Sequence, residues 1–567
     1  MKKSIENKIK EVLESLGIKD VDFVIEHPDD FSHGDYSTNV AMVLAKKAGK
    51  NPRQLSEEIK TEIEKSLPSN IEKVKIAGPG FINFYLSREF FTNKVKEILD
   101  KKKNWGKNEI LAGKKVMVEY SDPNPFKPFH VGHLMANAVG ESVSRIVEFS
   151  GAETIRANYQ GDIGLHVAKA IYGLNKFGLP DENKNVSEKA IYIGECYSKA
   201  SNIYDEDEIA KKEIDELNKK IFLKDKSIKD VYNWGREITL EAFEIIYKIL
   251  DTKFKYYFFE SEMTHIGKKI VQENIGKIFE ESEGAIIFRG ENHDPKLHTR
   301  VFINSQGVPT YETKEIGLTL TKFEKEKDLD ISIVTTAIEQ AEYMKVVQKA
   351  ISLMYPEMEK KMKHVTHGMM KLSNGKMSSR KGNIITGESL INDSISVVRE
   401  KILEREFSDE EKNQISERVG VSALRYSILK SSLGSDIIYD FEKSISFDGD
   451  SGPYLQYTAV RANSILEKSK DFNLIGKEEI PNEVFELEKV LYQFDEIVEK
   501  SYLNLEPHHI VKYLTELASS FNVFYGNTRI LVDDNKCAKY HLDLIKAFYQ
   551  TMENGLWLLG IKIPDKM

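Results

Sequence analysis

The stretch from 116 to 149 constrains the fold more than any other part of the sequence. A short apolar run, Val116 to Val118, is followed by a polar, proline-rich turn, and apolar residues then recur at helical spacing as far as Val147. A strand, a turn and a helix in this order open a parallel α/β unit, whose ligands lie at the carboxyl ends of the strands. We therefore expect a ligand site in the turn.

Two histidines, His130 and His133, stand at the start of the predicted helix, with Gly132 between them. Imidazoles three residues apart share one helix face, and a glycine lets a flat group approach the backbone. The free N–H groups and partial positive charge of a helix N-terminus suit a phosphate. This pattern suits a nucleotide-phosphate site, but from these residues alone a pair of capping or core histidines is the more common explanation. We expect no metal here, because no cysteine or other third ligand is evident.

A second polar segment lies far downstream, at residues 371–383, and has the sequence KLSNGKMSSRKGN. Its Asn-Gly pair predicts a tight turn. Three cations follow the turn: Lys376, Arg380 and Lys381. Such a loop could close over a triphosphate and neutralise the charge that grows on departing pyrophosphate. By itself, a basic loop of this kind is more often a solvated surface segment.

HVGH and KMSSR, in this order, resemble the two signatures of class I aminoacyl-tRNA synthetases. Three segments resemble the arginyl-tRNA synthetase family in particular: VEYSDPNPFKPFHVGH, YETKEIG at 311–317, and GKMSSRKGN. The resemblance runs nearly end to end. It implies an ATP-dependent ligase that joins L-arginine to the 3′ end of tRNA(Arg) through an arginyl-adenylate, with release of AMP and pyrophosphate.

The resemblance also implies an ATP site. The catalytic residues it assigns are His130, His133, Lys376 and Arg380, and the further ATP-binding residues are Gly132, Gly161, Asp162, Met377, Ser378 and Lys381. Gly161 and Asp162 follow a predicted second strand, where a glycine allows close backbone approach. We expect Mg²⁺ to accompany ATP, held mainly by phosphates and water. The two scattered cysteines argue against a structural zinc site.

An arginine site is predicted around residues 311–317. Tyr311 and Glu315 share a helix face, and together they could hold a guanidinium by stacking and by a bidentate fork. From the residues alone, a helix start with favourable acids explains the pair equally well. The resemblance implies an arginine-binding set of Glu119, Ser121, Asn124, Tyr311, Glu315 and Gln340. The sequence departs from the family at Glu315, where an aspartate is usual.

The pattern along the chain predicts three domains. Residues 1–105 are expected to form an α+β domain, residues 106–395 a Rossmann-like parallel-sheet catalytic domain with a helical insertion at about 173–260, and residues 396–567 an all-helical domain. The resemblance implies that the first contacts the tRNA elbow and the last binds the anticodon. In the last domain, Tyr457 and Arg461 could stack on and pair with unstacked bases, and Tyr454 joins them as a tRNA-binding candidate.

Composition limits the partners and the location. The net charge of −9 means that any tRNA contact must rest on small basic patches. The sequence has no run of about 18 apolar residues, so we expect no membrane span. Two cysteines fit a reducing cytoplasm. We expect a cytoplasmic monomer that uses arginine, ATP and tRNA(Arg).

Two alternatives remain at this point. One is a class I enzyme that loads another amino acid, such as cysteine, but this would need a zinc–thiolate site that two distant cysteines are unsuited to build. The other is a protein that binds tRNA and has lost catalysis, which the presence of both signatures argues against.

Overall fold

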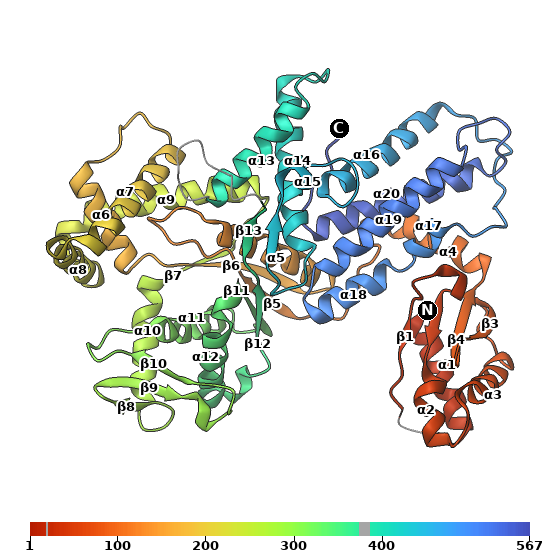
Figure 1. The fold of residues 1–567 in the computed structure, drawn as a ribbon, viewed down its shortest axis with the longest axis horizontal. Helices are drawn as coiled ribbons and strands as arrows, with labels where there is room; N and C mark the ends of the chain where they lie inside the picture. The colour runs from red at the N-terminus through yellow and green to blue at the C-terminus, as the bar shows by residue number, and fades with distance from the viewer. Residues whose placement is uncertain (19–20, 374–385) are drawn as a thin grey trace. The chain divides into compact units, whose positions relative to one another are not determined.

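A computed structural model describes residues 1–18, 21–373 and 386–567 (Figure 1). The described chain divides into two compact units, each assembled from separate segments. The first unit comprises residues 1–105, 461–495 and 515–554, and the second comprises residues 106–460, 496–514 and 555–567. The predicted domain limits at 105 and 395 remain predictions. Among the described residues, no helix combines the length and the apolar character that a membrane crossing requires.

The second unit contains a five-stranded parallel sheet, which confirms the predicted Rossmann-like fold. Its spatial order is β12 (Met362–His367), β11 (Ile331–Ala337), β5 (Lys115–Glu119), β6 (Glu153–Gln160) and β7 (Tyr256–Phe259). After β5 the chain forms β6 and β7 on one side of β5, and it later forms β11 and β12 on the other side. The strand order therefore reverses between β5 and β11, where an open parallel sheet places its ligand crevice.

Helix α5 (Val131–Phe149) follows β5 and is buried along almost its whole length: sixteen of its nineteen residues are buried. Close packing requires a glycine at Gly140, because a Cβ there would lie 2.2 Å from the Tyr120 side chain. A helix buried on every side cannot shift without disturbing the sheet. The start of α5 is thus fixed relative to the end of β5.

Helices separate β6 from β7. They are α6 (Leu165–Phe177), α7 (Val186–Glu206), α8 (Glu208–Phe222) and α9 (Lys229–Ile249), and they surround an apolar core that includes Val167, Ile171 and Ile193. The elements that follow β7 are α10 (Glu260–Glu273), a small antiparallel sheet of β8 (Glu280–Ser282), β9 (Ala285–Arg289) and β10 (Thr299–Ile303), then α11 (Tyr311–Lys325) and α12 (Ala341–Met354). Helices α10 and α11 pack closely, since a Cβ on Gly317 would lie 2.4 Å from the Met263 carbonyl oxygen.

Residues 396–567, predicted to be all-helical, are helical apart from β14 (Ile437–Tyr439), the one strand among the described residues of this part. Strand β14 pairs in parallel with β13 (Met370–Leu372). The helices are α13 (Gly387–Lys401), α14 (Asp409–Leu429), α15 (Phe441–Ser444), α16 (Gly452–Lys468), α17 (Glu486–Leu491), α18 (Phe494–Asn504), α19 (His508–Asn527) and α20 (Ala538–Leu558).

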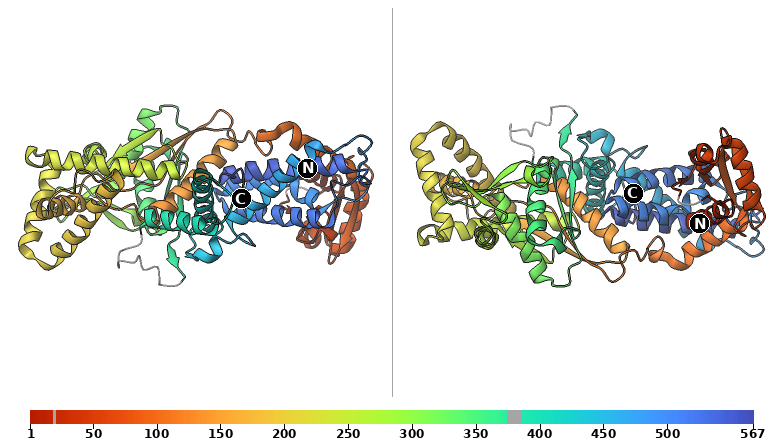
Figure 2. Two further views of the ribbon diagram at one scale, coloured as in Figure 1. Left: turned by 90° about the horizontal axis from the view of Figure 1, so that it is seen from above. Right: turned by 90° about the horizontal axis from the view of Figure 1, so that it is seen from below.

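The first unit begins with the predicted α+β region. An antiparallel sheet has the order β1 (Ile25–Glu26), β2 (Tyr36–Thr38), β4 (Phe81–Leu86) and β3 (Ile71–Ala77). The helices of this region are α1 (Lys2–Ser15), α2 (Val40–Ala48), α3 (Pro52–Glu64) and α4 (Arg88–Lys101) (Figures 1 and 2). Apolar residues at helical spacing, such as Ile5 and Ile9, bury against residues of the sheet, such as Phe84.

A residue from the far end of the chain completes this core. The Tyr492 ring packs 5.4 Å from that of Phe90 and 5.7 Å from that of Phe91, and its hydroxyl donates to the Asp35 carbonyl oxygen at 3.2 Å. The Asp35 carboxylate accepts the Leu86 N–H at 2.8 Å. The polar turn around Asp35 therefore ties strands together.

Candidate functional site

The turn between β5 and α5 has a strained backbone. Ser121, Asp122 and Phe126 have φ angles of +80°, +49° and +68°, a region that residues other than glycine seldom adopt. Strain of this kind persists where surrounding structure enforces it, and it clusters at functional sites. Two hydrogen bonds hold the turn on the end of β6: the Tyr159 N–H donates to Asp122 Oδ1 at 2.7 Å, and the Gly161 N–H donates to Asn124 Oδ1 at 3.2 Å.

The two predicted phosphate-site histidines lie together at the start of α5. Their rings stack, with centroids 3.5 Å apart, and the His130 N–H donates to His133 Nδ1 at 3.2 Å. His133 is buried and His130 is exposed. Gly132 makes the stacking possible, because a Cβ there would lie 2.9 Å from His130 Cε1.

Both imidazoles are neutral at neutral pH. Although part of His130 is exposed, the surrounding protein desolvates its imidazole, and this desolvation and the nearby Lys127 lower the pKa of His130 to about 4. Burial, together with His130, lowers the pKa of His133 well below its usual value. Neutral imidazoles can donate one hydrogen bond each but supply no charge. The positive charge that a triphosphate needs must come from other groups.

The chain returns to His130 after the basic segment. Thr386 pairs with His130 in an isolated antiparallel bridge, and the Gly387 N–H donates to the Phe129 carbonyl oxygen at 2.7 Å. A Cβ on Gly387 would lie 2.9 Å from the His130 carbonyl oxygen, so the approach requires glycine. The predicted ATP-site residues Lys376, Met377, Ser378, Arg380 and Lys381 lie outside the described residues.

Gly161 and Asp162 lie at the end of β6, beside Asn124. A Cβ on Gly161 would lie 2.3 Å from Asn124 Oδ1, so glycine is needed for this contact. The Asp162 carboxylate accepts from the Ser261 N–H at 2.9 Å, the Ser261 hydroxyl at 2.8 Å and Arg236 Nε at 3.2 Å. These partners join the turn to α9 and α10. ATP binding by both residues remains a prediction.

A cluster of buried acids lies at the end of β5 and on α11. Glu119 is the last residue of β5, and Glu315 is on α11. Glu119 Oε2 lies 2.7 Å from Lys322 Nζ, and both side chains are almost completely buried. Glu315 Oε1 is buried without a hydrogen-bond partner, as are the Tyr159 hydroxyl and Gln160 Oε1. Buried polar atoms without partners cost about 1–3 kcal/mol each, and such a concentration is expected where a polar ligand binds.

Burial and like charge dominate the electrostatics of this cluster. Burial and Glu119 raise the pKa of Glu315 to about 7. The same two causes raise the pKa of Asp122 well above its usual value. Lys322 opposes both shifts. An incoming cation would relieve the repulsion between these carboxylates, so the cluster is suited to a positively charged ligand.

The other predicted arginine-site residues differ in their burial. Tyr311 begins α11 and is 66% exposed, with Lys314 Nζ 4.7 Å above its ring. Lys314 also pairs with the buried Glu260 at 2.7 Å. Ser121 is buried in the strained turn. Gln340 follows β11 and is exposed, and its Oε1 accepts from the Tyr343 hydroxyl at 3.4 Å.

Sequence reasoning missed three residues of the cluster: Asp122, Lys322 and Tyr343. Burial and, after it, the charges of Glu315 and Glu119 raise the pKa of Tyr343. Lys322 follows Glu315 by seven residues, a spacing that returns to the same helix face. That spacing was the signal that could have identified it.

The predicted tRNA-binding residues all lie on α16. Tyr454, Tyr457 and Arg461 are partly buried. The Tyr457 ring lies 6.4 Å from that of Phe447, and Arg461 Nη1 donates to Asn522 Oδ1 at 3.1 Å. Both side chains thus have neighbours within the protein, and their role in tRNA binding remains a prediction.

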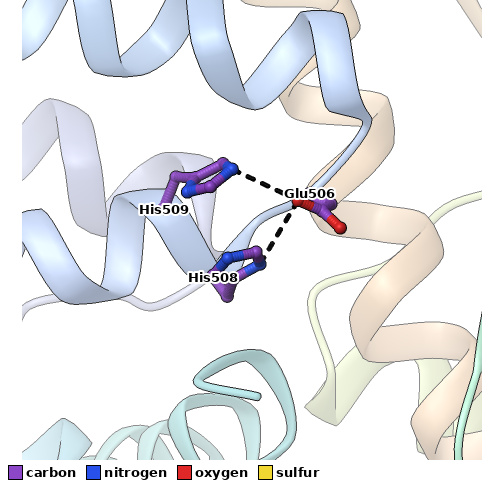
Figure 3. Close-up of side chains that lie close together, drawn as sticks. All are labelled: Glu506, His508 and His509. Atoms are coloured by element: carbon purple, nitrogen blue, oxygen red, sulfur yellow. Dashed lines mark ion pairs between the residues drawn. The ribbon is translucent and has the colours of Figure 1, made fainter. Parts of the chain in front are cut away.

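One group of side chains in the described part of the chain has the donor set of a metal site. Glu506 Oε2 lies 3.2 Å from His509 Nε2 and 3.8 Å from His508 Nδ1 (Figure 3). His509 Nε2 also lies 3.2 Å from Asn504 Nδ2. Because His509 already contacts two neighbours, and Glu506 precedes the start of α19 where an acid is favourable, the group has an explanation without a metal.

Comparison with known proteins agrees with the fold. The family described as "tRNA synthetases class I (R), catalytic domain" matches residues 94–441. The "Arginyl tRNA synthetase N terminal domain" matches residues 2–86, and the "DALR anticodon binding domain" matches residues 455–567. Two curated relatives, the arginine–tRNA ligases of Halothermothrix orenii and Clostridium perfringens, are each 32% identical. The aligned regions cover 100% of this chain and 99% and 100% of the relatives, respectively.

Solved structures show the same fold over the whole chain. The arginyl-tRNA synthetase of Thermus thermophilus has a TM-score of 0.82 at 24% identity and covers 100% of both chains. That of Plasmodium falciparum has a TM-score of 0.81 at 23% identity, covering 100% of this chain and 99% of its own. The parallel sheet, the paired histidines and the catalytic-domain match define a class I aminoacyl-tRNA synthetase. Within that class, the chain belongs to the arginyl-tRNA synthetase family.

Proposed function

We propose that this protein attaches L-arginine to the 3′ end of tRNA(Arg) in two steps. The arginine carboxylate attacks the α-phosphate of ATP, pyrophosphate leaves, and arginyl-adenylate forms. The 2′-hydroxyl of the terminal adenosine of tRNA then attacks the adenylate carbonyl, and AMP leaves. The observation that carries the proposal is the excess of buried acids over cations at the end of β5 and on α11, beside a helix start suited to phosphate.

The acids suit a guanidinium better than an ammonium group. Arginine stays charged at all working pH values and presents five donors in a plane, whereas lysine presents a point charge. Glu119, Glu315 and Asn124 supply acceptors at the end of β5 and on α11, and Tyr311 supplies an aromatic face. Acceptors fixed for a planar fork would be left partly unpaired by lysine, which costs affinity.

No side-chain nucleophile is needed, because the substrates carry the reacting groups. Catalysis then rests on positioning and on charge stabilisation. In this proposal His130 and His133 donate hydrogen bonds to phosphate oxygens. Lys127, whose charge acts on His130, supplies positive charge near them. Lys376, Arg380 and Lys381 supply further charge. Mg²⁺ accompanies ATP and is held mainly by phosphates and water.

The proposal extends to tRNA. Residues 1–105 would contact the tRNA elbow, residues 106–395 would hold the reacting groups, and residues 396–567 would bind the anticodon, with Tyr454, Tyr457 and Arg461 among the contacts. We propose that the protein acts as a monomer, without a zinc ion. We place the reaction in the cytoplasm, where ribosomes consume the charged tRNA.

The test is aminoacylation of total tRNA with arginine, lysine, cysteine and citrulline in parallel. We expect charging with arginine alone, together with ATP–pyrophosphate exchange that depends on arginine when tRNA is present. Charging with cysteine would favour another class I enzyme. A silent exchange reaction with tRNA present would favour a tRNA-binding protein without catalysis.

A further inference from the structure

The acidic cluster contains one lysine for which the proposed reaction has no role. Lys322 lies on α11 with its side chain 1% exposed, and its Nζ is 2.7 Å from Glu119 Oε2. Lysine is among the residues least often buried, because taking an ammonium group out of water costs several kcal/mol. The position therefore calls for an explanation beyond packing.

The surroundings of Lys322 are acidic on several sides. Glu119 approaches from β5, Asp122 from the strained turn, and Glu315 from one helical face of α11 itself. The same acids, Glu119 and Glu315, also raise the pKa values of Tyr159 on β6 and Tyr343 on α12.

One further pair of charged groups belongs to this neighbourhood. Glu260 on α10 raises the pKa of Glu315, as its charge adds to that of Glu119, and Glu260 is itself paired with Lys314 at 2.7 Å. With that pair balanced, Lys322 is the cation among the described residues that acts on three acids: it pairs with Glu119 and lowers the pKa of Asp122 and of Glu315. The ammonium group neutralises one of the three and leaves a place for a second cation.

We propose that Lys322 is a positioning residue for arginine recognition: its ammonium group fixes the Glu119 carboxylate, so that an arriving guanidinium finds this acceptor already in position. The inference rests on the proposed function. Lys322 acts through Glu119 and does not touch the substrate. A carboxylate has two oxygens with about four acceptor positions, so Glu119 can hold Lys322 and still accept from a guanidinium.

The site then excludes lysine as well as admitting arginine. The place beside Glu119 Oε2 is already taken by an ammonium group. A second ammonium would be a point charge close to the first, whereas a planar guanidinium spreads its charge and can reach several acceptors at once. Lys322 therefore adds a repulsive element to the selection, which is a common route to specificity.

The test is a double-mutant cycle in the full-length protein. The four proteins are wild type, Lys322→Gln, Glu119→Gln and the double variant, with Lys325→Gln as a control because Lys325 is exposed on the same helix. Arginine-dependent ATP–pyrophosphate exchange is measured with saturating tRNA, at varied arginine and varied ATP, from pH 6 to 9. Lys322→Arg is added as the variant that keeps the charge.

We expect Lys322→Gln to raise the KM for arginine at least about tenfold, since one decade corresponds to the loss of a modest ionic contact. The KM for ATP should change less than about twofold. The acidic limb of the kcat/KM profile should move to higher pH, because Lys322 no longer favours the ionised acids. Lys322→Arg should keep the position of that limb.

The cycle separates positioning from packing. If Lys322 acts through Glu119, the double variant should have nearly the same KM for arginine as Glu119→Gln alone. Three results would overturn the proposal. The first is a double variant whose rise in the KM for arginine equals the product of the two single rises, and the second is an equal rise in the KM for ATP in Lys322→Gln. The third is an acidic limb of the kcat/KM profile that moves as far in Lys322→Arg as in Lys322→Gln. If Lys322→Gln does not fold, the double variant removes both partners of the Lys322–Glu119 pair, and its comparison with Glu119→Gln still decides. Failure of the proposed function would show in wild type, as exchange that arginine does not stimulate.

Discussion

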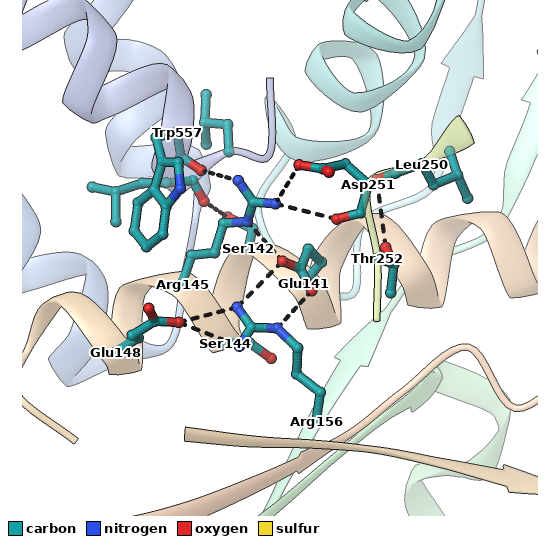
Figure 4. A network of polar contacts seen from close by, with 12 residues as sticks. Glu141, Ser142, Ser144, Arg145, Glu148, Arg156, Leu250, Asp251, Thr252 and Trp557 are labelled. Carbon is teal, nitrogen blue, oxygen red and sulfur yellow. Dashed lines mark hydrogen bonds and ion pairs between the residues drawn. The ribbon is translucent and has the colours of Figure 1, made fainter. Parts of the chain in front are cut away.

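The second unit contains two buried ionic clusters, one on α5 and β6 and the other at the end of β5 and on α11, and they differ in completeness. In one, Glu141 on α5 accepts from Arg145 Nε at 2.7 Å and from Arg156 Nε at 2.9 Å (Figure 4). Arg145 also donates to the Trp557 carbonyl oxygen at 3.0 Å, and Arg156 pairs with Glu148. In the other, the described residues supply one ammonium group, that of Lys322, for the three acids Glu119, Asp122 and Glu315.

The difference separates a structural cluster from a binding site. Burial alone would raise the pKa of Glu141, but Arg156 and Arg145 outweigh it and lower that pKa. The opposite balance holds at Glu315, whose pKa is raised. A buried acid with its cations in place stabilises the fold, whereas buried acids that lack a cation are arranged for one that arrives with the ligand.

The largest effect is expected for stability when Glu141 is removed. Glu141→Ala leaves Arg145 without its buried acid, and breaking a buried pair costs about 3–5 kcal/mol. The melting temperature should fall strongly, while the KM for arginine of the folded enzyme stays near the wild-type value. Glu148→Ala is the control, because Glu148 is exposed. An equal loss of stability in the control would remove the distinction between the clusters.

Glu315→Gln should show the reverse pattern. Loss of one partner of a buried charged contact costs about 2–5 kcal/mol, which corresponds to a fall of roughly 30-fold to several thousand-fold in kcat/KM for arginine. Stability should be unchanged or improved, since the substitution removes a repelled buried charge. Aminoacylation kinetics and thermal unfolding measure the two effects, with Glu324→Gln, an exposed acid on α11, as the control.

If Glu315→Gln had the wild-type kcat/KM for arginine, the guanidinium contact would be assigned to Glu119. The cluster at the end of β5 would then have a different division of roles, with Glu315 reserved for local structure.

The pH dependence of kcat/KM for arginine should follow the ionisation of Glu315. A carboxyl group with a pKa of about 7 must ionise to hold a guanidinium, so kcat/KM for arginine should rise about tenfold from pH 6 to pH 8. His130, with a pKa of about 4, does not titrate in this range. Because the pKa of Glu315 is higher in the folded state than in the unfolded chain, the ligand-free protein should lose stability as pH rises from about 4.5 to 7.

The rise of kcat/KM for arginine between pH 6 and pH 8 should vanish in Glu315→Gln. A profile that is flat from pH 6 to 8 in wild type would show that Glu315 is already ionised and would contradict the raised pKa. A limb that persists in Glu315→Gln would assign it to Asp122 instead.

The smallest effect is expected at Asp162, whose carboxylate has its partners in place, as Glu141 has. Asp162→Asn should cost about 1–3 kcal/mol of stability, because the contacts with Arg236 and Ser261 weaken. The KM for ATP should change less than about threefold. A tenfold rise in that KM with unchanged stability would instead place Asp162 among the ligand contacts that the family resemblance implies.

The sequence predicted what depends on local pattern. The strand, turn and helix around residues 116–149, the paired histidines and the acids Glu119 and Glu315 all follow from spacing or from motifs. The left-handed backbone at Ser121 and Asp122 could not be predicted, because no glycine marks it. The role of Lys322 depends on a strand two hundred residues earlier in the chain, and helical spacing alone cannot show what a helix face packs against.

The position of Tyr492 in the first unit has a consequence for synthesis. Its hydroxyl bonds to the backbone of Asp35, 457 residues earlier. At about 5–20 residues per second, a ribosome needs on the order of 20–90 s to make the chain between them. During that time the apolar surface around Phe90 and Phe91 lacks its last cover. The nascent chain therefore has to remain protected from aggregation until the segment around Tyr492 emerges.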